Sequence, residues 1–277
     1  MKTILITGTT SGIGEVTALE LAKAGHHVVM ANRNRAKSEQ VRAAICAQTG
    51  NDRIDLLDLD LASLDSVRAC SQAFRTQYDK LDILINNAGL TSHTEVITED
   101  GYELQFAVNA LAQFLLTLEL LPSLESAAPS QVIFVTSMMH KFGKLDFASF
   151  TGWKHYNGTK SYSQSKLAMM LLARELAERL DGRQIVVNTL HPGAVNTGIL
   201  DGYSKFAQFF LRRFFVSPEK GAKTSLFLAG QMPQSMPSKK YFVGGKEAAS
   251  HKLVDNSAMR EKLWDTCCGY LDRASAL

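Results

Sequence analysis

Short apolar runs alternate with longer amphipathic segments along almost the whole chain, and this alternation limits the fold more than any other feature. Seven runs are expected to be strands: Thr3–Thr7, His27–Asn32, Arg53–Asp60, Leu81–Asn86, Gln131–Ser137, Gln184–Leu190 and Lys240–Val243. Six segments have helical periodicity: Gly12–Ala24, Arg35–Thr49, Leu64–Tyr78, Gly101–Leu121, Ser161–Leu180 and Pro218–Gly230. Nearly continuous apolar strands separated by helices form a parallel sheet that is covered on both faces. The sequence therefore predicts an α/β fold with a doubly wound, seven-stranded parallel sheet.

The length and composition fit one domain. The chain has 277 residues, of which 45% are hydrophobic and 21% charged, and doubly wound folds of this size commonly have a single core. We therefore expect one domain over 1–277, without an internal linker or repeat. The formal net charge of +3 is too small to indicate a nucleic-acid partner.

The cysteines and the N-terminal residues indicate the cellular compartment. Cys46, Cys70, Cys267 and Cys268 lack the spacing of metal ligands, so we expect reduced thiols and no metal site. Because the first residues already have the pattern of a strand, neither a signal peptide nor an N-terminal membrane anchor is expected. These features predict a cytoplasmic protein without a transmembrane segment.

A glycine-rich turn joins the first predicted strand to the first predicted helix. It runs from Gly8 to Gly14 with the sequence Gly-Thr-Thr-Ser-Gly-Ile-Gly. Glycines let the backbone approach a pyrophosphate closely, and a helix N-terminus supplies N–H groups and a positive dipole end. An ordinary strand-to-helix turn is the alternative, but the place of the turn at the start of a βαβ pattern favours a dinucleotide site. The expected cofactor contacts are Gly8, Thr10, Ser11, Gly12, Ile13 and Gly14.

Tyr162 and Lys166 are four residues apart in a predicted helix, so their side chains share one face. An ammonium beside a phenol stabilises the phenolate and lets the tyrosine exchange a proton nearer neutral pH than its free pKa of about 10 allows. Ser137, at the end of a predicted strand, can donate a hydrogen bond to the same reacting oxygen. These groups suffice to protonate a carbonyl oxygen while a hydride arrives at its carbon. Tyr156 competes for this role, but the segment around Gly158 has the pattern of a loop, which favours Tyr162.

These motifs together resemble the short-chain dehydrogenase/reductase family. The matching segments are Thr-Gly-x-x-x-Gly-x-Gly at Thr7–Gly14 and Asn-Asn-Ala-Gly at Asn86–Gly89, followed by Asn109, Ser137, Tyr162, Lys166, Pro192-Gly193 and Thr197. They follow the family's order and cover nearly the whole chain. Within the family the chain is most similar to the retinol dehydrogenase-like and protochlorophyllide reductase-like branch, through Ala31–Asn34, Leu59–Leu64, Ser163–Ala168 and Lys240–Phe242.

The resemblance implies a Rossmann fold and reversible hydride transfer between a nicotinamide and a carbonyl carbon. Tyr162 then acts as acid and base, Lys166 favours the phenolate and binds the nicotinamide ribose, and Ser137 orients the substrate. Asn109 resembles the family residue that holds a water connecting Lys166 to solvent; a buried asparagine with a structural role is the alternative. His191 is expected to be structural.

The end of the second predicted strand informs the choice of cofactor. The family places there an acidic residue that binds the ribose hydroxyls of NAD, whereas this chain has Asn32 followed by Arg33. Cations without a carboxylate suit a ribose phosphate, and by resemblance Arg33 and Lys37 contact it. A solvated positive helix start is the alternative. We therefore expect NADP(H) in preference to NAD(H).

The resemblance assigns further cofactor contacts. Asp60 corresponds to the acidic residue that contacts the adenine amino group. The other expected contacts are Leu61, Asn87, Ala88, Gly89, Pro192, Val195 and Thr197, together with Tyr162 and Lys166.

The substrate is the least specified part of the prediction. The segment at about 198–216 falls where the family has its variable substrate loop. Within it, aromatics at Phe206–Val216 suit a lid over a bulky apolar carbonyl or alcohol, although core packing and a weak contact with a membrane surface are alternatives. Met138, Met139, His140 and Phe142 are expected to line the same pocket.

Two other functions stay open. One is a ring C=C reductase resembling protochlorophyllide reductase. The observation against it is that no cysteine lies near the active-site segments. The other is a non-catalytic dinucleotide sensor, although such proteins tend to lose the tyrosine or lysine. The oligomeric state is also open, because the apolar run Leu167–Leu172 fits either pairing between chains or core packing.

Overall fold

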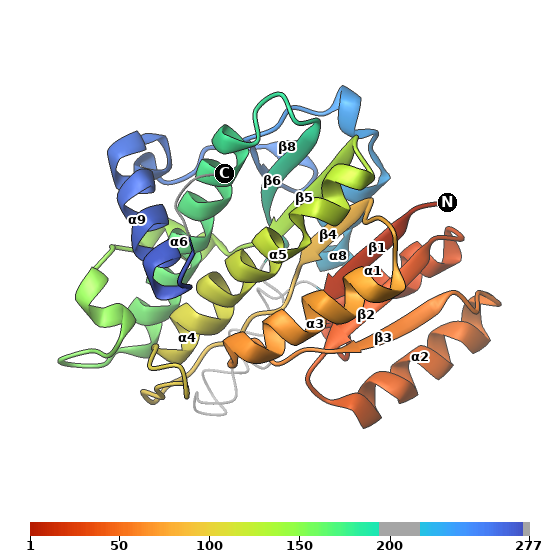
Figure 1. Cartoon of the computed structure of the whole chain (residues 1–277), viewed down its shortest axis with the longest axis horizontal. Helices are drawn as coiled ribbons and strands as arrows, with labels where there is room; N and C mark the ends of the chain where they lie inside the picture. The colour runs from red at the N-terminus through yellow and green to blue at the C-terminus, as the bar shows by residue number, and fades with distance from the viewer. Residues whose placement is uncertain (194–216, 274–277) are drawn as a thin grey trace.

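The computed structural model describes residues 1–193 and 217–273, which form a twisted sheet with helices on both faces (Figure 1). Its strands are β1 (Thr3–Thr7), β2 (His27–Asn32), β3 (Ile54–Asp58), β4 (Ile83–Asn86), β5 (Ser130–Val135), β6 (Ile185–His191), β7 (Tyr241–Val243) and β8 (Lys246–Glu247). Its α-helices are α1 (Gly12–Lys23), α2 (Arg35–Thr49), α3 (Leu64–Gln77), α4 (Leu104–Phe106), α5 (Ala112–Ser126), α6 (Gly158–Arg179), α8 (Pro218–Gly230) and α9 (Ser257–Tyr270). Short helical turns are η1 (Ala107–Leu111), η2 (Met138–Phe142), η3 (Phe147–Phe150), η4 (Pro233–Ser235) and η5 (Lys252–Asp255).

The strand order is β3-β2-β1-β4-β5-β6-β7-β8. Neighbouring strands from β3 to β7 are parallel, with registers such as Leu5 opposite Val29 and Leu84 opposite Val132. The order reverses between β1 and β4, and in doubly wound folds ligands bind in the crevice at the carboxyl ends of such strands. The α/β doubly wound prediction is therefore confirmed.

An eighth strand extends the predicted seven. β8 pairs antiparallel with β7, and Val243 lies opposite Lys246. Gly244 and Gly245 between them have φ of 59° and 77°, the left-handed geometry of a two-residue hairpin turn. The sequence Gly-Gly was the signal for this hairpin, and the prediction of a purely parallel sheet overlooked it.

Two hydrophobic clusters lie on opposite faces of the sheet because successive side chains of a strand point to opposite sides. Leu5, Leu84 and Val132 belong to the cluster under α3, α5, α6 and α9. Their strand neighbours, such as Ile4 and Ile133, belong to the cluster under α1, α2 and α8. Figure 1 shows α3, α5 and α6 crossing one face of the sheet.

The fourth predicted helix starts later and ends later than Gly101–Leu121. It starts at Leu104 because the Glu103 carboxylate accepts hydrogen bonds from the amides of Gln105 and Phe106, at 3.1 and 2.9 Å. It continues through Pro122 to Ser126, since the apolar face beyond that proline, including Leu124, is buried. Tertiary packing here outweighs the usual cost of an interior proline.

α6 begins at Gly158, three residues before the prediction, because the Asn157 side chain accepts a hydrogen bond from the amide of Lys160. The expectation of a loop around Gly158 was wrong. α9 was not predicted at all, because charged residues dilute its pattern. Its apolar stripe is nevertheless buried: Leu263, Trp264, Cys267 and Cys268, followed by the buried Leu271 at its C-terminal end.

α9 covers the face made by α5 and α6. The Trp264 ring packs edge-on against Phe114 at 4.7 Å between centroids, and Arg260 pairs with Glu175 of α6 at 3.1 Å. The run Leu167–Leu172 is buried within the chain. Core packing therefore accounts for this apolar run without a partner chain.

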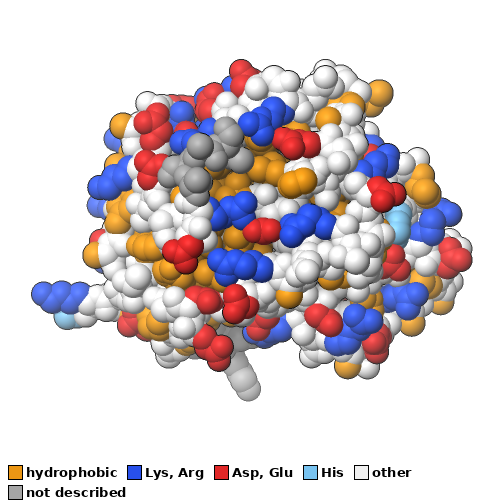
Figure 2. All heavy atoms as spheres, in the orientation of Figure 1, with side chains coloured by type: hydrophobic (Ala, Val, Ile, Leu, Met, Phe, Trp, Pro, Cys, Tyr) orange, Lys and Arg blue, Asp and Glu red, His pale blue; other side chains and the backbone are white. Residues whose placement is uncertain are grey.

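Within residues 1–193 and 217–273, one helix, Leu104–Ser126, is long and apolar enough to span a membrane, and 89% of its apolar window is buried inside the protein. It is a core helix. On the face that Figure 2 shows, Lys and Arg side chains are interspersed with Asp and Glu.

Candidate active site

The turn between β1 and α1 packs backbone against backbone. Gly8 and Gly12 have φ of 71° and 61°, a conformation that favours glycine. A Cβ on Gly14 would overlap the carbonyl oxygen of Gly8 and would lie 2.5 Å from Asn87 Nδ2. We call Gly8–Gly14 the glycine cradle, since its shape depends on these missing side chains.

The N-terminus of α1 has no side-chain cap. Ser11, at the N-cap position, is exposed and makes no capping hydrogen bond within the described part of the chain. Side chains do cap other helices, including α2, α3, α6 and α9 through Asn34, Ser63, Asn157 and Asn256. The first amides of a helix lack intrahelical acceptors, so the predicted residues Thr10, Ser11, Gly12 and Ile13 offer donors to a phosphate.

Asn32, at the end of β2, fixes the cradle. Its Oδ1 accepts a hydrogen bond from the amide of Thr9 at 2.6 Å, and its Nδ2 donates to Thr9 Oγ1 at 2.8 Å. Both side chains are buried. Sequence reasoning valued Asn32 only for the missing carboxylate, because a contact between residues so far apart leaves no local signal.

The turn after β4 is bound to the start of the cradle. Thr7 Oγ1 accepts hydrogen bonds from the amides of Asn87 and Ala88, at 3.0 and 2.9 Å. The Asn87 side chain donates to the carbonyls of Thr7 and Gly8, at 2.8 and 3.0 Å. The predicted cofactor residues Gly8, Asn87 and Ala88 are thus brought together, and Thr7 is the unpredicted residue that joins them.

Ser137, Tyr162 and Lys166 lie together next to the turn after β4. Ser137 follows β5, and its side chain hydrogen-bonds the phenol of Tyr162 on α6. Lys166, one turn further along α6, is buried. Its Nζ lies 5.9 Å from the centroid of the Tyr162 ring and donates to the carbonyl of Val135 at 3.2 Å. The three side chains therefore occupy one site, as the spacing predicted.

The pKa values differ from the sequence-based expectation. Burial raises the pKa of Tyr162 above its ordinary value, and the hydrogen bond from Ser137 only partly offsets this. Burial also lowers the pKa of Lys166 to about 8. The expected lowering of the phenol pKa is therefore wrong for the protein without ligands, because desolvation of the phenol outweighs the hydrogen bond from Ser137.

Asn109 lies in the π-helical turn η1. Its Oδ1 accepts from the amide of Leu90 at 2.8 Å, and its Nδ2 donates to the Leu90 carbonyl at 2.9 Å and to Ser165 Oγ at 3.0 Å. A Cβ on Gly89 would lie 3.1 Å from Lys166 Nζ and 3.2 Å from Asn109 Oδ1. Asn109 therefore ties the turn after β4 to α6 next to Lys166, and its water-holding role stays a prediction.

The residues predicted to contact the adenosine end of the cofactor lie beyond the carboxyl ends of β2 and β3. Arg33 and Lys37 are exposed just beyond β2. Asp60 is partly buried, and its Oδ1 accepts a hydrogen bond from the amide of Ala62 at 2.9 Å. The Leu61 side chain is buried in the core, so its backbone is the part that could contact a nucleotide.

The predicted contacts for the nicotinamide end are only partly described. Pro192 follows β6 and is partly buried. Val195, Thr197 and the substrate segment at about 198–216, including Phe206–Val216, lie outside the described residues.

Tyr156, the competing tyrosine, has a structural position. Its hydroxyl donates to the carbonyl of Ser92 at 3.1 Å and accepts from Gln105 Nε2 at 2.8 Å. It precedes α6 and is not on the face that carries Tyr162 and Lys166.

The segment after Ser137 was expected to line the substrate pocket. Met138 and Phe142 are 49% and 71% exposed, so both are available to a ligand. His140 is fully buried and its ring packs against Tyr241, so the expectation that it lines the pocket was wrong. Sequence reasoning could not separate these side chains because η2 has no regular apolar pattern.

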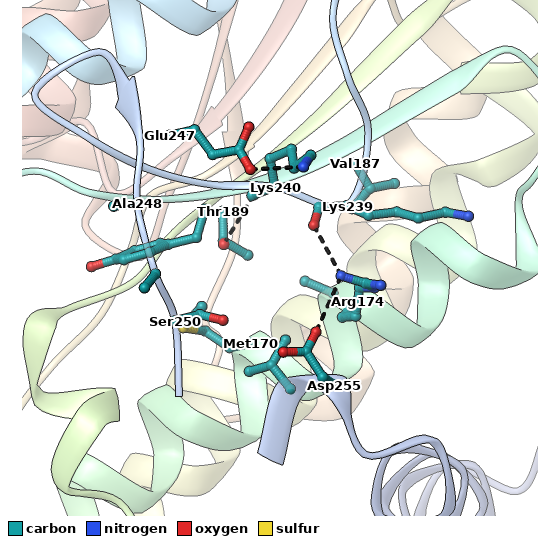
Figure 3. Close-up of a pocket in the computed structure, with 14 residues that line it drawn as sticks. Met170, Arg174, Val187, Thr189, Lys239, Lys240, Glu247, Ala248, Ser250 and Asp255 are labelled. Carbon is teal, nitrogen blue, oxygen red and sulfur yellow. Dashed lines mark hydrogen bonds and ion pairs between the residues drawn. The ribbon is translucent and has the colours of Figure 1, made fainter. Parts of the chain in front are cut away.

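A separate pocket of about 270 Å³ lies between α6, β7 and the segment after β8 (Figure 3). Its charged side chains already have partners: Lys240 pairs with Glu247 at 2.7 Å, Arg174 with Asp255 at 3.7 Å, and Lys239 with Glu178 outside the pocket at 2.8 Å. None of the predicted site residues lines it.

The observed arrangement fits a nicotinamide dinucleotide. The Gly14 backbone packs directly against the Gly8 carbonyl, where no Cβ fits, and the N-terminus of α1 offers amides without a side-chain cap. Gly89, in the turn after β4, lies against Lys166 and Asn109, and the same turn is bound to the cradle through Thr7 and Asn87. Exposed Arg33 provides a cation at the adenosine end.

Comparisons with known proteins agree with this arrangement. A model of the short chain dehydrogenase family matches residues 2–207. Retinol dehydrogenase 14 of Mus musculus is 41% identical to this chain over 95% of the chain and 84% of its own length. The crystal structure of an uncharacterized protein from Mycobacterium paratuberculosis has a TM-score of 0.82 at 30% identity, covering 100% of this chain and 96% of that one. RhlG of Pseudomonas aeruginosa, solved as an active-site complex with NADP, has a TM-score of 0.72 at 25% identity and covers 87% and 93%.

Proposed function

The chain belongs to the short-chain dehydrogenase family, and from that premise we propose that it is an NADP(H)-dependent oxidoreductase of a bulky apolar carbonyl or alcohol. The observation that carries this proposal is the convergence of Ser137, Tyr162 and Lys166 next to the glycine cradle. A phenol, a hydroxyl and an ammonium at one place serve proton transfer to a carbonyl oxygen.

Each side chain has a distinct part in the proposed reaction. When bound, NADP(H) supplies or accepts a hydride at C4 of its nicotinamide. Tyr162 donates its proton to the carbonyl oxygen in reduction and recovers it in oxidation. Ser137 hydrogen-bonds the same oxygen and fixes its direction. The Lys166 ammonium lowers the free energy of the phenolate, and Asn109 holds the backbone beside Lys166.

The expected cofactor contacts divide by region. The glycine cradle would hold the pyrophosphate, Arg33 and Lys37 the 2′-phosphate, and Tyr162 and Lys166 the nicotinamide ribose. NADP(H) is preferred because no carboxylate follows β2. Asn32 is occupied by Thr9, and Arg33 has no ion pair within residues 1–193 and 217–273. The NADP named for RhlG supports the same choice.

The proposed substrate class rests on two observations. Retinol dehydrogenase 14 carries the name of a bulky apolar alcohol, and the exposed Met138 and Phe142 lie directly after Ser137. An apolar substrate would cover such side chains. A ring C=C reduction has less support, since Cys70, Cys267 and Cys268 are buried in helices.

Cys46, Cys70, Cys267 and Cys268 form no disulfide in the described part of the chain, as suits a reducing compartment, and we also propose a cytoplasmic location. Fractionation of cells that express the chain tests this directly, since recovery of the protein in a membrane pellet would contradict it.

A substrate panel tests the function. Aldehydes, ketones and alcohols of increasing size are each tried with NADPH or NADH and followed by absorbance of the reduced nicotinamide. We expect turnover of bulky apolar carbonyls with NADPH and much slower turnover with NADH. Tight NADPH binding without turnover of any compound would contradict the carbonyl reductase and favour a sensor.

A further inference from the structure

Two buried histidines hold one peptide group next to Ser137, at its two polar ends. The peptide between Ser137 and Met138 has the Ser137 carbonyl on one side and the Met138 amide on the other. We propose that His140 and His191 are positioning residues that fix this peptide, and with it the direction of Ser137 Oγ. This inference rests on the proposed function, in which Ser137 binds the substrate oxygen.

His191 holds the amide end. It is the last residue of β6 and is 5% exposed. Its Nδ1 lies 3.2 Å from the Met138 nitrogen. Because the amide is the donor, Nδ1 carries no proton, and the neutral ring has its proton on Nε2.

His140 holds the carbonyl end. It lies in η2 and is fully buried. Its Nδ1 is 2.6 Å from the Ser137 carbonyl oxygen. A carbonyl oxygen only accepts, so this Nδ1 carries the proton. His140 Nε2 has no hydrogen-bond partner in the described part of the chain, and the ring packs edge-on against Tyr241 at 4.9 Å.

The two rings therefore have opposite tautomers, and each tautomer matches the end of the peptide that it holds. Burial lowers the pKa of both histidines to about 4, so both rings are neutral at pH 7. A neutral ring is required at His191, because an imidazolium has no nitrogen that can accept from an amide.

Fixing this peptide fixes the serine. Its plane sets ψ of Ser137, which is 154° in an extended residue. The same plane sets the place of the Met139 amide, which donates to Ser137 Oγ at 3.3 Å, so a rotation of the peptide would withdraw a donor that holds Oγ. Both neighbours of the peptide are already anchored. β5 pairs with β6 on one side, and on the other a Cβ on Gly143 would lie 2.6 Å from the Ser163 carbonyl on α6. The Ser137 carbonyl also accepts from the backbone amide of His140 at 3.1 Å, and the two imidazoles add a side-chain restraint at each end of the peptide.

A double-mutant cycle separates positioning from a purely structural role. His191→Leu removes the acceptor, and His191→Asn restores an oxygen near the position of Nδ1. We expect His191→Leu to lower kcat about tenfold, since misplacement by about 1 Å costs up to about 100-fold. The dissociation constant of NADPH should stay unchanged, and His191→Asn should recover most of the loss. In a Ser137→Ala background, His191→Leu should have no further effect on kcat.

A matched control comes from the opposite end of the sheet. His26 Nδ1 also accepts a backbone amide, that of Lys2, at 3.4 Å. His26→Leu should leave kcat unchanged. An equal loss of kcat from His191→Leu with and without Ser137 would overturn the positioning role, as would an equal loss from His26→Leu.

A readout without turnover keeps this inference distinct from the proposed function. Long-range ¹H–¹⁵N correlation spectra of the imidazoles report tautomers in the folded protein without ligands. We expect His140 protonated at Nδ1 and His191 protonated at Nε2. Finding both rings in the same tautomer would overturn the inference even if the enzyme reduces carbonyls. A wild-type protein without turnover on any carbonyl would instead overturn the proposed function.

Discussion

The glycine cradle and the catalytic cluster of Ser137, Tyr162 and Lys166 lie at the same end of the sheet but are built from different material. The cradle acts through backbone, and its shape depends on atoms that Gly8, Gly12 and Gly14 lack. The cluster acts through side-chain atoms that are present. Substitutions therefore damage the cradle by adding atoms and damage the cluster by removing them.

This difference also separates the expected measurements. A faulty cradle should weaken cofactor binding, whereas a faulty cluster should lower kcat while the cofactor still binds. Thr7 and Asn87 link the turns after β1 and β4, so the two regions share a frame, and the variants below test how independent they are.

The largest effect is expected in the catalytic cluster. Tyr162→Phe removes only the phenolic oxygen and should lower kcat by about 1000-fold, the scale of a lost general acid. The dissociation constant of NADPH, from fluorescence titration, should be nearly unchanged. Tyr156→Phe is the matched control, since it removes another phenolic oxygen that bonds Gln105, and its kcat should stay near that of wild type. A similar loss of kcat in both variants would remove Tyr162 from the acid role.

The next largest effect is expected in the cradle. Gly14→Ala adds a Cβ that overlaps the Gly8 carbonyl, and the required shift should weaken NADPH binding about 100-fold. Gly269→Ala adds the same atom in α9 where no other atom lies within 4 Å. That control should bind NADPH as wild type does. Normal NADPH affinity in Gly14→Ala would contradict the cradle's role.

Acid should act on the catalytic side of the site, because Gly8–Gly14 contains no titratable side chain. The pKa of His140 and of His191 is lowered to about 4 in the folded protein, against about 6.5 when unfolded. Between these values the unfolded chain binds more protons, so the free energy of unfolding falls as the pH falls.

Each histidine should contribute about 2 kcal/mol to this loss between pH 7 and pH 5. Urea denaturation at the two pH values measures it. His191→Asn should lose less stability over the same interval than wild type. If His191→Asn loses as much free energy of unfolding between pH 7 and pH 5 as wild type does, His191 is not buried in the neutral form.

The smallest effect is expected at the adenosine end. Arg33→Ala should weaken NADPH binding about tenfold, the scale of one exposed charge-assisted hydrogen bond, and leave NADH almost unchanged. Arg35→Ala serves as the control, because Arg35 already pairs with Glu39 at 3.0 Å and with Asp58 at 3.6 Å. Equal losses for both cofactors in Arg33→Ala would mean that Arg33 does not contact the 2′-phosphate.

The sequence predicted those parts of the fold that local patterns determine. α2 and α8 have the predicted bounds, and the glycine spacing placed the cradle. The start of the fourth helix was missed because Glu103 caps it through its own side chain. α9 was missed because its stripe is short and interrupted by charge, although Leu263, Trp264, Cys267 and Cys268 follow helical spacing.

The supporting contacts of the site were the least predictable part. Asn32 with Thr9, and His191 with Met138, join residues that are distant in sequence. Only the sheet order brings them together. The side chains that do chemistry have a recognisable spacing, whereas the side chains that hold them depend on tertiary structure.

The most direct test of the account follows the hydride itself. A bulky apolar aldehyde is incubated with the protein and with NADPH deuterated at the transferred position of C4, and the product is examined by mass spectrometry and NMR. The account predicts one deuterium on the carbinol carbon of an alcohol, formed by wild type and almost not at all by Tyr162→Phe. An alcohol without deuterium, or deuterium on a reduced C=C bond, would contradict it.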